Sequence, residues 1–375
     1  MKKCIVISDS FKGTISSLEI CRIARESIPK FFPQCQVLTV PVADGGEGTV
    51  DCFVEAIGAQ RVKAVVTGPY GEPIQASYGR KDGCAIIEMA AAAGLPMVGE
   101  RRDPARTTTY GVGQLIAHAV EHGCREILLG LGGSATNDGG CGCAAALGVK
   151  FYDRQGAEFV PTGLTLDHIH KIDVSRARER LEGVTITVMC DVDNPLYGPR
   201  GAAYIFAPQK GANQDMVAQL DEGLRKLDKA IQMSLNCSVA DLPGAGAAGG
   251  MGGGCVAFLG ARLKSGIESV LDTIGFDVML EGTDLVITGE GRIDSQSVHG
   301  KVISGIAGRA KPRNIPLLAL VGGIAEDAAA GYDLGVTAMF SIDRSAQDFW
   351  EYAPKSAVYY QRTLEDILRL IRAVI

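Results

Sequence analysis

The stretch IVISDSFKG, residues 5–13, places a short run of β-branched residues before a polar loop that ends in glycine. Such a run predicts a buried strand. The stretch DLVITGEGRID, residues 284–294, shows the same order of strand and polar glycine-containing loop near the other end of the chain. We therefore expect two segments far apart in the sequence to be strands of one sheet.

Helices are predicted between these strands and their neighbours. Ser16 and Glu19 have the spacing of a capping box, and apolar residues follow at helical intervals. Further strands are predicted at 36–42, 316–321 and 337–341, with helices at about 49–57, 301–311 and 353–374. Alternating strands and helices predict parallel βαβ units, so the two ends should form one doubly wound domain.

The length of 375 residues favours two domains. We expect residues 1–60 and 284–375 to form the doubly wound parallel-sheet domain, with residues 61–283 inserted as a second, mixed α/β domain. Within the insertion, strands are predicted at 62–67, 74–79, 84–89, 126–130 and 184–190, and helices near 110–122, 139–147 and 214–233.

Composition and charge narrow the class of protein. The formal net charge is −6 with no long basic stretch, which argues against a nucleic-acid partner. No apolar run approaches the roughly 18 residues of a membrane span. The eleven cysteines include no C-x-x-C pair, and we interpret them all as buried, reduced thiols. These features predict a cytoplasmic protein without a membrane anchor, and they leave both a monomer and a homodimer open.

Three polar loops follow predicted strands of the terminal domain, at 8–13, 43–48 and 289–294. Ligands of open parallel sheets bind beyond the carboxyl ends of the strands. The loops should therefore meet at one sheet edge, where they would gather five carboxylates, one lysine and one arginine. Each loop alone is compatible with ordinary turn chemistry, but three at one edge indicate a small-molecule site.

The inserted domain has a loop of its own, LGGSATNDGG at 131–140, between a predicted strand and an alanine-rich helix. A strand, a glycine-rich turn and a helix form the geometry that presents backbone N–H groups to phosphate. The spacing matches neither the P-loop nor the dinucleotide-binding motif. The prediction is an anion site of unnamed type.

Three more stretches carry candidate chemistry. In CDVDNP, residues 190–195, two carboxylates two positions apart can share Mg²⁺ or divide metal and base roles. PQKG at 208–211 places Lys210 in a turn. LPGAGAAGGMGGG at 242–254 indicates either a very close backbone approach to a ligand or a flexible flap, and both stay open.

Seven of these stretches together resemble the bacterial glycerate kinases. They are DSFKG at 9–13, PVADGGEGT at 41–49, LGGSATNDGG at 131–140, CDVDNP at 190–195, PQKGA at 208–212, LPGAGAAGG at 242–250 and ITGEGRID at 287–294. They occur in the order typical of that family and cover nearly the whole chain. The resemblance implies a flavodoxin-like terminal domain and ATP-dependent phosphorylation of D-glycerate, with 2-phosphoglycerate as product and 3-phosphoglycerate as the alternative.

With ATP and Mg²⁺ as implied cofactors, roles can be assigned as hypotheses. Asp44 or Asp191 would be the catalytic base, and Asp193, with Asp191 or Asp138, would bind Mg²⁺. A cation would hold the glycerate carboxylate. The substrate-binding candidates are Ser10, Lys12, Glu47, Glu290, Arg292, Asp294 and Lys301. The candidates for contact with the ATP phosphates are Gly132, Gly133, Ser134, Thr136, Asn137 and Lys210.

Two rival functions follow from the same residues. Asp191 and Asp193 are also compatible with a Mg²⁺-dependent phosphohydrolase, although Asn194 departs from the haloacid dehalogenase pattern. A sugar-acid binding protein without catalysis is the second rival. The number of carboxylates on glycine-rich loops argues against it, because an anion sensor would not gather negative charge at its site.

Overall fold

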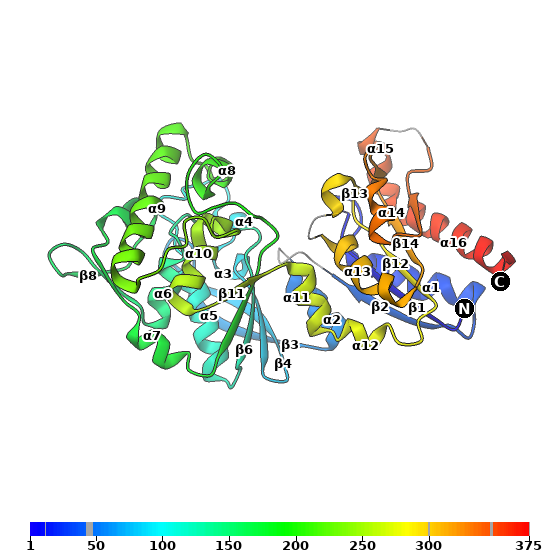
Figure 1. Cartoon of the computed structure of the whole chain (residues 1–375), viewed down its shortest axis with the longest axis horizontal. Coiled ribbons are helices and arrows are strands. Elements are labelled where there is room, and N and C mark those ends of the chain that lie inside the picture. Colours follow the sequence, from blue (N-terminus) through cyan, green and yellow to red (C-terminus); the bar gives the residue numbers. More distant parts are fainter. Residues whose placement is uncertain (12, 43–47, 299–300, 346–347, 375) are drawn as a thin grey trace. The chain divides into compact units, whose positions relative to one another are not determined.

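Within the described residues, five parallel strands from both ends of the chain form one sheet (Figure 1). The structure is a computed structural model. It describes residues 1–11, 13–42, 48–298, 301–345 and 348–374. The strand order is β2-β1-β12-β14-β16. The strands are β1 (Lys3–Ser8), β2 (Gln36–Pro41), β12 (Leu285–Thr288), β14 (Leu317–Val321) and β16 (Ala338–Ser341).

The strand order is 2-1-3-4-5, which is the flavodoxin-like order of a doubly wound sheet. Ile5 in β1 lies beside Leu38 on one side and Val286 on the other. Because strands from the two ends of the chain are direct neighbours, neither end can complete this sheet alone. The predicted flavodoxin-like α/β domain is confirmed.

Helices cover both faces of this sheet. Alternate residues of β1 and β12, including Val6 and Ile287, pack with α1 (Ser17–Phe31) and α16 (Ser356–Val374), which lie against each other (Figure 1). On the other side, α13 (Val302–Ala310) contacts β12 and β14. Residues 4–7 are fully buried because both faces are covered.

Helix α1 begins as the sequence predicts, but with half of the capping box. The Ser16 hydroxyl accepts a hydrogen bond from the Glu19 amide at 3.2 Å, which satisfies one free N–H of the first turn. The Glu19 carboxylate bonds to Arg22 at 2.6 and 2.8 Å. The N-cap therefore rests on Ser16, and Glu19 contributes an ion pair on the helix surface.

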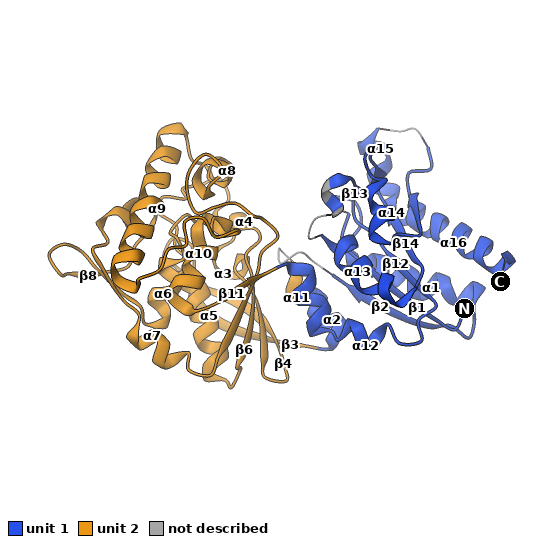
Figure 2. Ribbon diagram, in the orientation of Figure 1, with its two compact units in different colours: residues 1–44, 51–58, 265–375 blue, residues 45–50, 59–264 orange. Residues whose placement is uncertain are grey.

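The chain divides into two compact units (Figure 2). Unit 1 comprises residues 1–44, 51–58 and 265–375, and unit 2 comprises 45–50 and 59–264. Unit 2 thus includes residues 48–50 and 59–60, which we expected in the terminal domain. Unit 1 includes residues 265–283, which we expected in the inserted domain. Arg309 of α13 explains this, because its guanidinium bonds to Glu268 at 2.5 Å, Asp272 at 2.6 Å and Asp277 at 2.7 Å.

The smaller elements of unit 1 complete its layers. They are α2 (Thr49–Ile57), α11 (Gly266–Thr273), α12 (Phe276–Met279), α14 (Ala330–Leu334), α15 (Phe349–Tyr352), β13 (Arg292–Ile293) and β15 (Gly323–Ile324).

Unit 2 contains a mixed sheet that, over the described residues, has the strand order β11-β10-β6-β5-β4-β3. The first four strands are parallel, and β3, β4 and β5 are antiparallel. The five predicted strands are all present, and β11 is an addition. The bounds are β3 (Gln60–Thr67), β4 (Pro73–Lys81), β5 (Cys84–Glu88), β6 (Glu126–Gly130), β10 (Thr185–Met189) and β11 (Arg262–Lys264).

The three helices predicted in the insertion are α5 (Tyr110–Glu121), α6 (Cys141–Leu147) and α9 (Gln214–Leu235). A small sheet and shorter helices surround them. These are β7 (Lys150–Tyr152), β8 (Glu158–Phe159), β9 (Lys171–Asp173), α3 (Ala90–Ala93), α4 (Leu95–Val98), α7 (Ser175–Arg180) and α8 (Ala202–Phe206). Helix α10 (Ala247–Leu259) was not predicted, because its first half is rich in glycine.

The cysteines are free thiols at all eleven positions, each within the described ranges. The expectation that all are buried is wrong for Cys237, which is exposed in the connection after α9, and Cys35, Cys84 and Cys190 are only half-buried. Its neighbours in sequence are polar, so no apolar pattern draws it inward. Among the described residues, no helix combines the length and apolarity needed to cross a bilayer.

Candidate active site

The loop between β6 and α6, residues 131–140, lies mostly inside unit 2. Gly132 is half-buried and Gly133 is exposed, whereas residues 134–140 are buried. We expected this loop to present the N-terminus of the following helix to a phosphate. The structure shows instead that a carboxylate of the chain itself occupies that position.

Asp138 supplies this carboxylate and is completely buried. Its oxygens accept hydrogen bonds from the Thr109 amide and hydroxyl, both at 2.8 Å, from the Gly140 amide at 3.1 Å and from the Gly142 amide at 3.2 Å. Burial raises the pKa of Asp138, and the four hydrogen bonds oppose that shift. The helix dipole and the first amides of α6 therefore stabilise Asp138.

Lys210 reaches the same loop from the turn η2 (Pro208–Lys210). Its side chain is 2% exposed. The Nζ atom donates to Ser134 Oγ at 2.8 Å and to the Thr136 carbonyl at 2.7 Å. Burial lowers the pKa of Lys210 to about 7, and the charge of Asp138 opposes the shift. The fold thus brings Lys210 and the 131–140 loop together, and both carry candidates for contact with the ATP phosphates.

The glycine-rich stretch 244–254 covers the other side of the loop. It is buried throughout and leads into α10, with residues 248–250 in the left-handed backbone region. The Gly139 amide donates to the Gly249 carbonyl at 3.0 Å. A Cβ at Gly249 would lie 2.1 Å from the Thr136 oxygen. The stretch thus makes a close backbone approach to the 131–140 loop of the chain itself, whereas the sequence had suggested an approach to a ligand or a flexible flap.

Two polar side chains in the loop lack partners. Thr136 and Asn137 are fully buried. The Thr136 hydroxyl and both amide atoms of Asn137 have no hydrogen-bond partner among the described residues. Burying such groups without a partner costs free energy, and they are therefore candidates for contact with a ligand or an ordered water.

Asp191 and Asp193 follow β10, the strand next to β6. The two strands are parallel, with Met189 beside Gly130 at their carboxyl ends, so the 131–140 loop and residues 190–195 leave the same sheet edge. Asp191 and Asp193 are exposed. Asp193 Oδ2 lies 3.4 Å from the Arg200 guanidinium. These carboxylates are accessible, and their placement at the strand ends agrees with the usual position of a ligand.

In unit 1, the loops after β1 and β12 are joined by hydrogen bonds. The Asp9 amide donates to the Gly289 carbonyl at 2.9 Å, and the Ser8 hydroxyl donates to the same carbonyl at 3.0 Å. Ser10 is half-buried, and its amide donates to Asp9 Oδ1 at 2.7 Å. Strand β2 is the other neighbour of β1. Lys12, Asp44 and Glu47 lie outside the described residues.

Glu290 lies at the centre of the loop after β12 and is 7% exposed. Its Oε1 atom has no partner within the described parts of the chain. Burial raises the pKa of Glu290, while the Ser297 hydroxyl and the charge of Lys301 oppose the shift. A buried carboxyl with an unused oxygen is suited to binding a hydroxyl group of a substrate.

Three further candidates surround Glu290 in sequence. Asp294 Oδ1 accepts from the Ser297 amide at 3.1 Å and lies 4.0 Å from Lys301 Nζ. Arg292 is exposed on β13, so it can reach a ligand only from the surface. Ser297 itself, buried and bonded to Asp294, was missed at the sequence level. The D-x-x-S spacing of 294–297 is the signal that could have found it.

The sequence matches the glycerate kinase family over residues 4–372. The chain belongs to this family. The glycerate kinase of Bacillus subtilis is 44% identical over 99% of this chain and 98% of its own length. The glycerate 2-kinase of Escherichia coli is 46% identical over 91% of this chain and 90% of its own length. A Salmonella typhimurium crystal structure described as a glycerate kinase 2 has a TM-score of 0.88, with 40% identity over 99% of this chain and 98% of that one.

As a member of the glycerate kinase family, the chain is a kinase, and the family resemblance seen in its motifs is confirmed.

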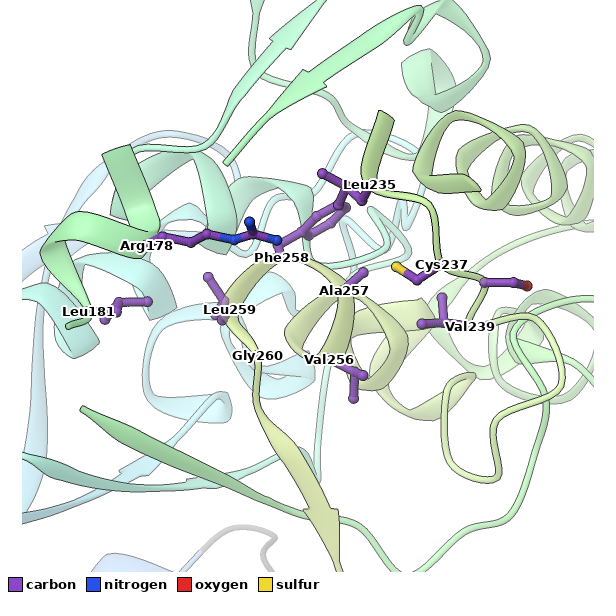
Figure 3. A pocket seen from close by; sticks show the side chains of 11 residues that line it. Arg178, Leu181, Leu235, Cys237, Val239, Val256, Ala257, Phe258, Leu259 and Gly260 are labelled. Atoms are coloured by element: carbon purple, nitrogen blue, oxygen red, sulfur yellow. The ribbon is translucent and has the colours of Figure 1, made fainter. Parts of the chain in front are cut away.

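Unit 2 also contains a cavity of about 480 Å³, shown in Figure 3. Phe258 and Gly260 at the C-terminal end of α10 line it, together with Cys237 and Arg178. It lies at the end of α10 opposite to the loop contact and is lined by no carboxylate, so it does not share the features of the candidate site.

The residues that were candidates for binding Mg²⁺ in this glycerate kinase family member are not equally suited to it. Asp138 does not fit, because its oxygens already accept four hydrogen bonds. Asp191 and Asp193 offer exposed carboxylates, and Mg²⁺ in kinases is usually held by one or two carboxylates plus substrate phosphates. Within the described ranges, no three His, Cys, Asp or Glu side chains are grouped to hold a metal without such a substrate.

Proposed function

We propose that this chain transfers the γ-phosphoryl group of ATP to a hydroxyl of D-glycerate and forms 2-phosphoglycerate. Membership of the glycerate kinase family supports the reaction class. The Escherichia coli relative, named a glycerate 2-kinase, supports the position of transfer. The observation that carries the proposal is the buried ammonium of Lys210 beneath a loop in which the Thr136 hydroxyl and the Asn137 amide lack partners among the described residues.

The ATP phosphates are assigned to the outer part of the 131–140 loop. Gly132 and Gly133 are the accessible residues there, and Ser134, Thr136 and Asn137 bring a hydroxyl, a second hydroxyl and an amide. Phosphoryl transfer depends on positioning and on stabilising charge at the phosphates. A cation below the loop and uncommitted donors within it meet both requirements.

Mg²⁺ is assigned to Asp193 with Asp191. When bound, the ion would neutralise charge on the phosphates. The role proposed for Asp138 changes: it stabilises the start of α6 and the bend of the loop through its four hydrogen bonds.

D-Glycerate is assigned to the loops of unit 1. Its carboxylate requires a cation, for which Lys12, Arg292 and Lys301 are the candidates. Its hydroxyl groups require acceptors, for which Glu47, Glu290 and Asp294 are the candidates, with Ser10 as a further polar contact. Asp44 or Asp191 would accept the proton of the reacting hydroxyl. The unused Oε1 of Glu290 supports its assignment most directly.

The Glu290→Gln variant is expected to raise the KM for glycerate about tenfold or more, as loss of a hydrogen bond to a charged group costs roughly 1.5–3 kcal/mol. Whereas substrate binding should weaken, the stability of the folded protein should increase at neutral pH. Because burial raises the pKa of Glu290 above its usual value, the unfolded chain ionises first as pH increases. The contribution of Glu290 to the stability of the wild type therefore falls as pH rises above about 4.5, and the variant lacks this contribution to the pH dependence.

Thermal melts at pH 4 and pH 7 and glycerate titrations test this prediction. The melting temperature of the variant relative to wild type should be higher at pH 7 than at pH 4. Glu281→Gln, at an exposed position of unit 1, is the matched control and should change neither quantity. An unchanged KM in Glu290→Gln would remove Glu290 from the substrate site.

The proposed reaction is tested by ADP release with ATP in the presence and absence of D-glycerate, followed by phosphorus NMR of the product. ADP release that requires glycerate supports the kinase. Phosphate release from phosphoesters without ATP consumption would support the phosphohydrolase instead. A product signal from 3-phosphoglycerate would retain the kinase and correct the position of transfer.

A further inference from the structure

The hydrogen bond between Lys210 and Ser134 has a fixed direction when the lysine is charged. An ammonium group has three donors and no acceptor, so Ser134 Oγ must accept in this 2.8 Å contact. The Ser134 proton is then left to point elsewhere. Within the described residues, the hydrogen bond with Lys210 is the one that the Ser134 hydroxyl makes, and in it Oγ is the acceptor. Ser134 is 8% exposed, at the border between the exposed and the buried parts of the loop.

Lys210 itself has little access to a ligand. It is 2% exposed, and its ammonium is bonded to Ser134 and to the Thr136 carbonyl, which lie 76 and 74 positions away in the sequence. Two of the three N–H donors of the ammonium are therefore committed to the chain, and the burial of Lys210 limits the access of a phosphate to the third. The Ser134 hydroxyl is nearer to the accessible residues Gly132 and Gly133 in the chain and is not committed as a donor.

We propose that Lys210 is a positioning residue, whose ammonium orients the Ser134 hydroxyl as a hydrogen-bond donor to a phosphate oxygen of the nucleotide. This proposal rests on the proposed function, and it replaces direct contact of Lys210 with the phosphates. The lysine also places positive charge beneath the phosphate position. Both the orientation of the Ser134 hydroxyl and the positive charge require Lys210 to be protonated.

The neutral amine can reverse the hydrogen bond. A neutral lysine has a lone pair, so it can accept from the Ser134 hydroxyl and turn that proton inward, away from a phosphate. Burial lowers the pKa of Lys210 to about 7, so both forms are accessible near neutral pH. The charged groups on the elements that contact Lys210 are Asp138, in the loop, and Arg102, whose guanidinium donates to the Gln209 carbonyl at 3.2 Å.

Nucleotide binding and protonation are then linked. A bound phosphate stabilises the ammonium and raises the pKa of Lys210, so binding above pH 7 takes up a proton. The dissociation constant for ATP should therefore rise as pH increases from 7 to 9. The Ser134 hydroxyl transmits part of this dependence, because it is the group that reorients.

The test is calorimetric titration of the full-length protein with Mg²⁺-ATP at pH 8, in HEPES and in Tris, combined with the pH dependence of binding between pH 7 and 9. Wild type should show proton uptake as a difference in heat between the two buffers. Ser134→Ala should bind ATP about tenfold more weakly, the usual effect of losing one hydrogen bond to a charged group. Its affinity should also depend less on pH than that of wild type.

A double-mutant cycle completes the test. Lys210→Met should abolish proton uptake, and adding Ser134→Ala to it should cause little further loss of affinity, because the two residues act as a unit. Ser238→Ala is the control: it removes an exposed hydroxyl of the same unit that donates to Asp228, and it should leave ATP binding unchanged. If Lys210→Met does not fold, the pH dependence of the affinity of Ser134→Ala for ATP still tests the proposal.

Two results would overturn the proposal. One is full wild-type pH dependence in Ser134→Ala, and the other is additive losses in the cycle; each would indicate that Lys210 acts on the phosphate without Ser134. Failure of the proposed function would look different, because wild type would then show neither ATP binding nor glycerate-dependent ADP release.

Discussion

The Asp44→Asn variant is expected to lose about 10²–10⁴-fold in kcat for glycerate phosphorylation, the range typical of a lost general base. Asp44 lies outside the described residues, and the prediction rests on its position after β2, the strand that pairs with β1. Loops that follow parallel strands of one sheet leave from one edge. The loss should appear in kcat more than in the KM for ATP, because proton acceptance matters in the transition state.

Asp191→Asn is the companion measurement, because Asp191 is the other candidate for the base. Steady-state kinetics of both variants, with ADP release as the readout, assign the role to the variant with the larger loss in kcat. If Asp44→Asn keeps a near-normal kcat, the assignment of the base to the 43–48 loop is wrong. A circular dichroism melt of each variant separates a chemical effect from unfolding.

The second large effect is expected for Gly249→Ala. Gly249 has φ of +69°, and a Cβ there would lie 2.1 Å from the Thr136 oxygen and 2.5 Å from the Asn137 Cα. The left-handed conformation alone costs a residue with a Cβ roughly 1–2 kcal/mol. The clash adds a cost of about 1–3 kcal/mol, typical of overpacking, or displaces the 131–140 loop. We expect a lower melting temperature and at least a tenfold higher KM for ATP.

Gly260→Ala provides a closely matched control at the other end of α10. Gly260 has φ of +65°, but a Cβ there would have nothing within 4 Å. This variant should carry only the backbone cost and keep its KM for ATP. If both variants lose stability equally and both keep that KM, then the contact between α10 and the loop does not position the nucleotide.

Much of the fold could be predicted from local patterns. Continuous apolar runs such as residues 4–7 indicate strands buried on both faces, and their alternation with helices indicates parallel units. Helix α10 could not be predicted in this way. Glycine disfavours helices, and the stretch is held by burial against the 131–140 loop rather than by helix propensity.

The loops that carry the candidate residues were predictable from the sequence, but the states of their side chains were not. Asp138 shows why. In the sequence it is one more carboxylate on a glycine-rich loop, and metal binding is a reasonable hypothesis. In the fold, Thr109 from a segment 29 positions away supplies two of its four hydrogen bonds. A hydrogen-bond donor this far away in the sequence leaves no recognisable pattern in the sequence of the loop itself.

The sequence by itself determined that the polar loops at 8–13, 131–140 and 289–294 follow strands. It could do so because strand and turn propensities act between residues that are near neighbours in the chain. It also determined the family, through motifs in a typical order. Only the tertiary structure decided that Lys210 is buried beneath Ser134 and that Gly249 presses against Thr136. Burial and hydrogen-bond direction arise from segments far apart in the chain, and they set which of the candidate groups are charged, which are committed and which remain available to a ligand.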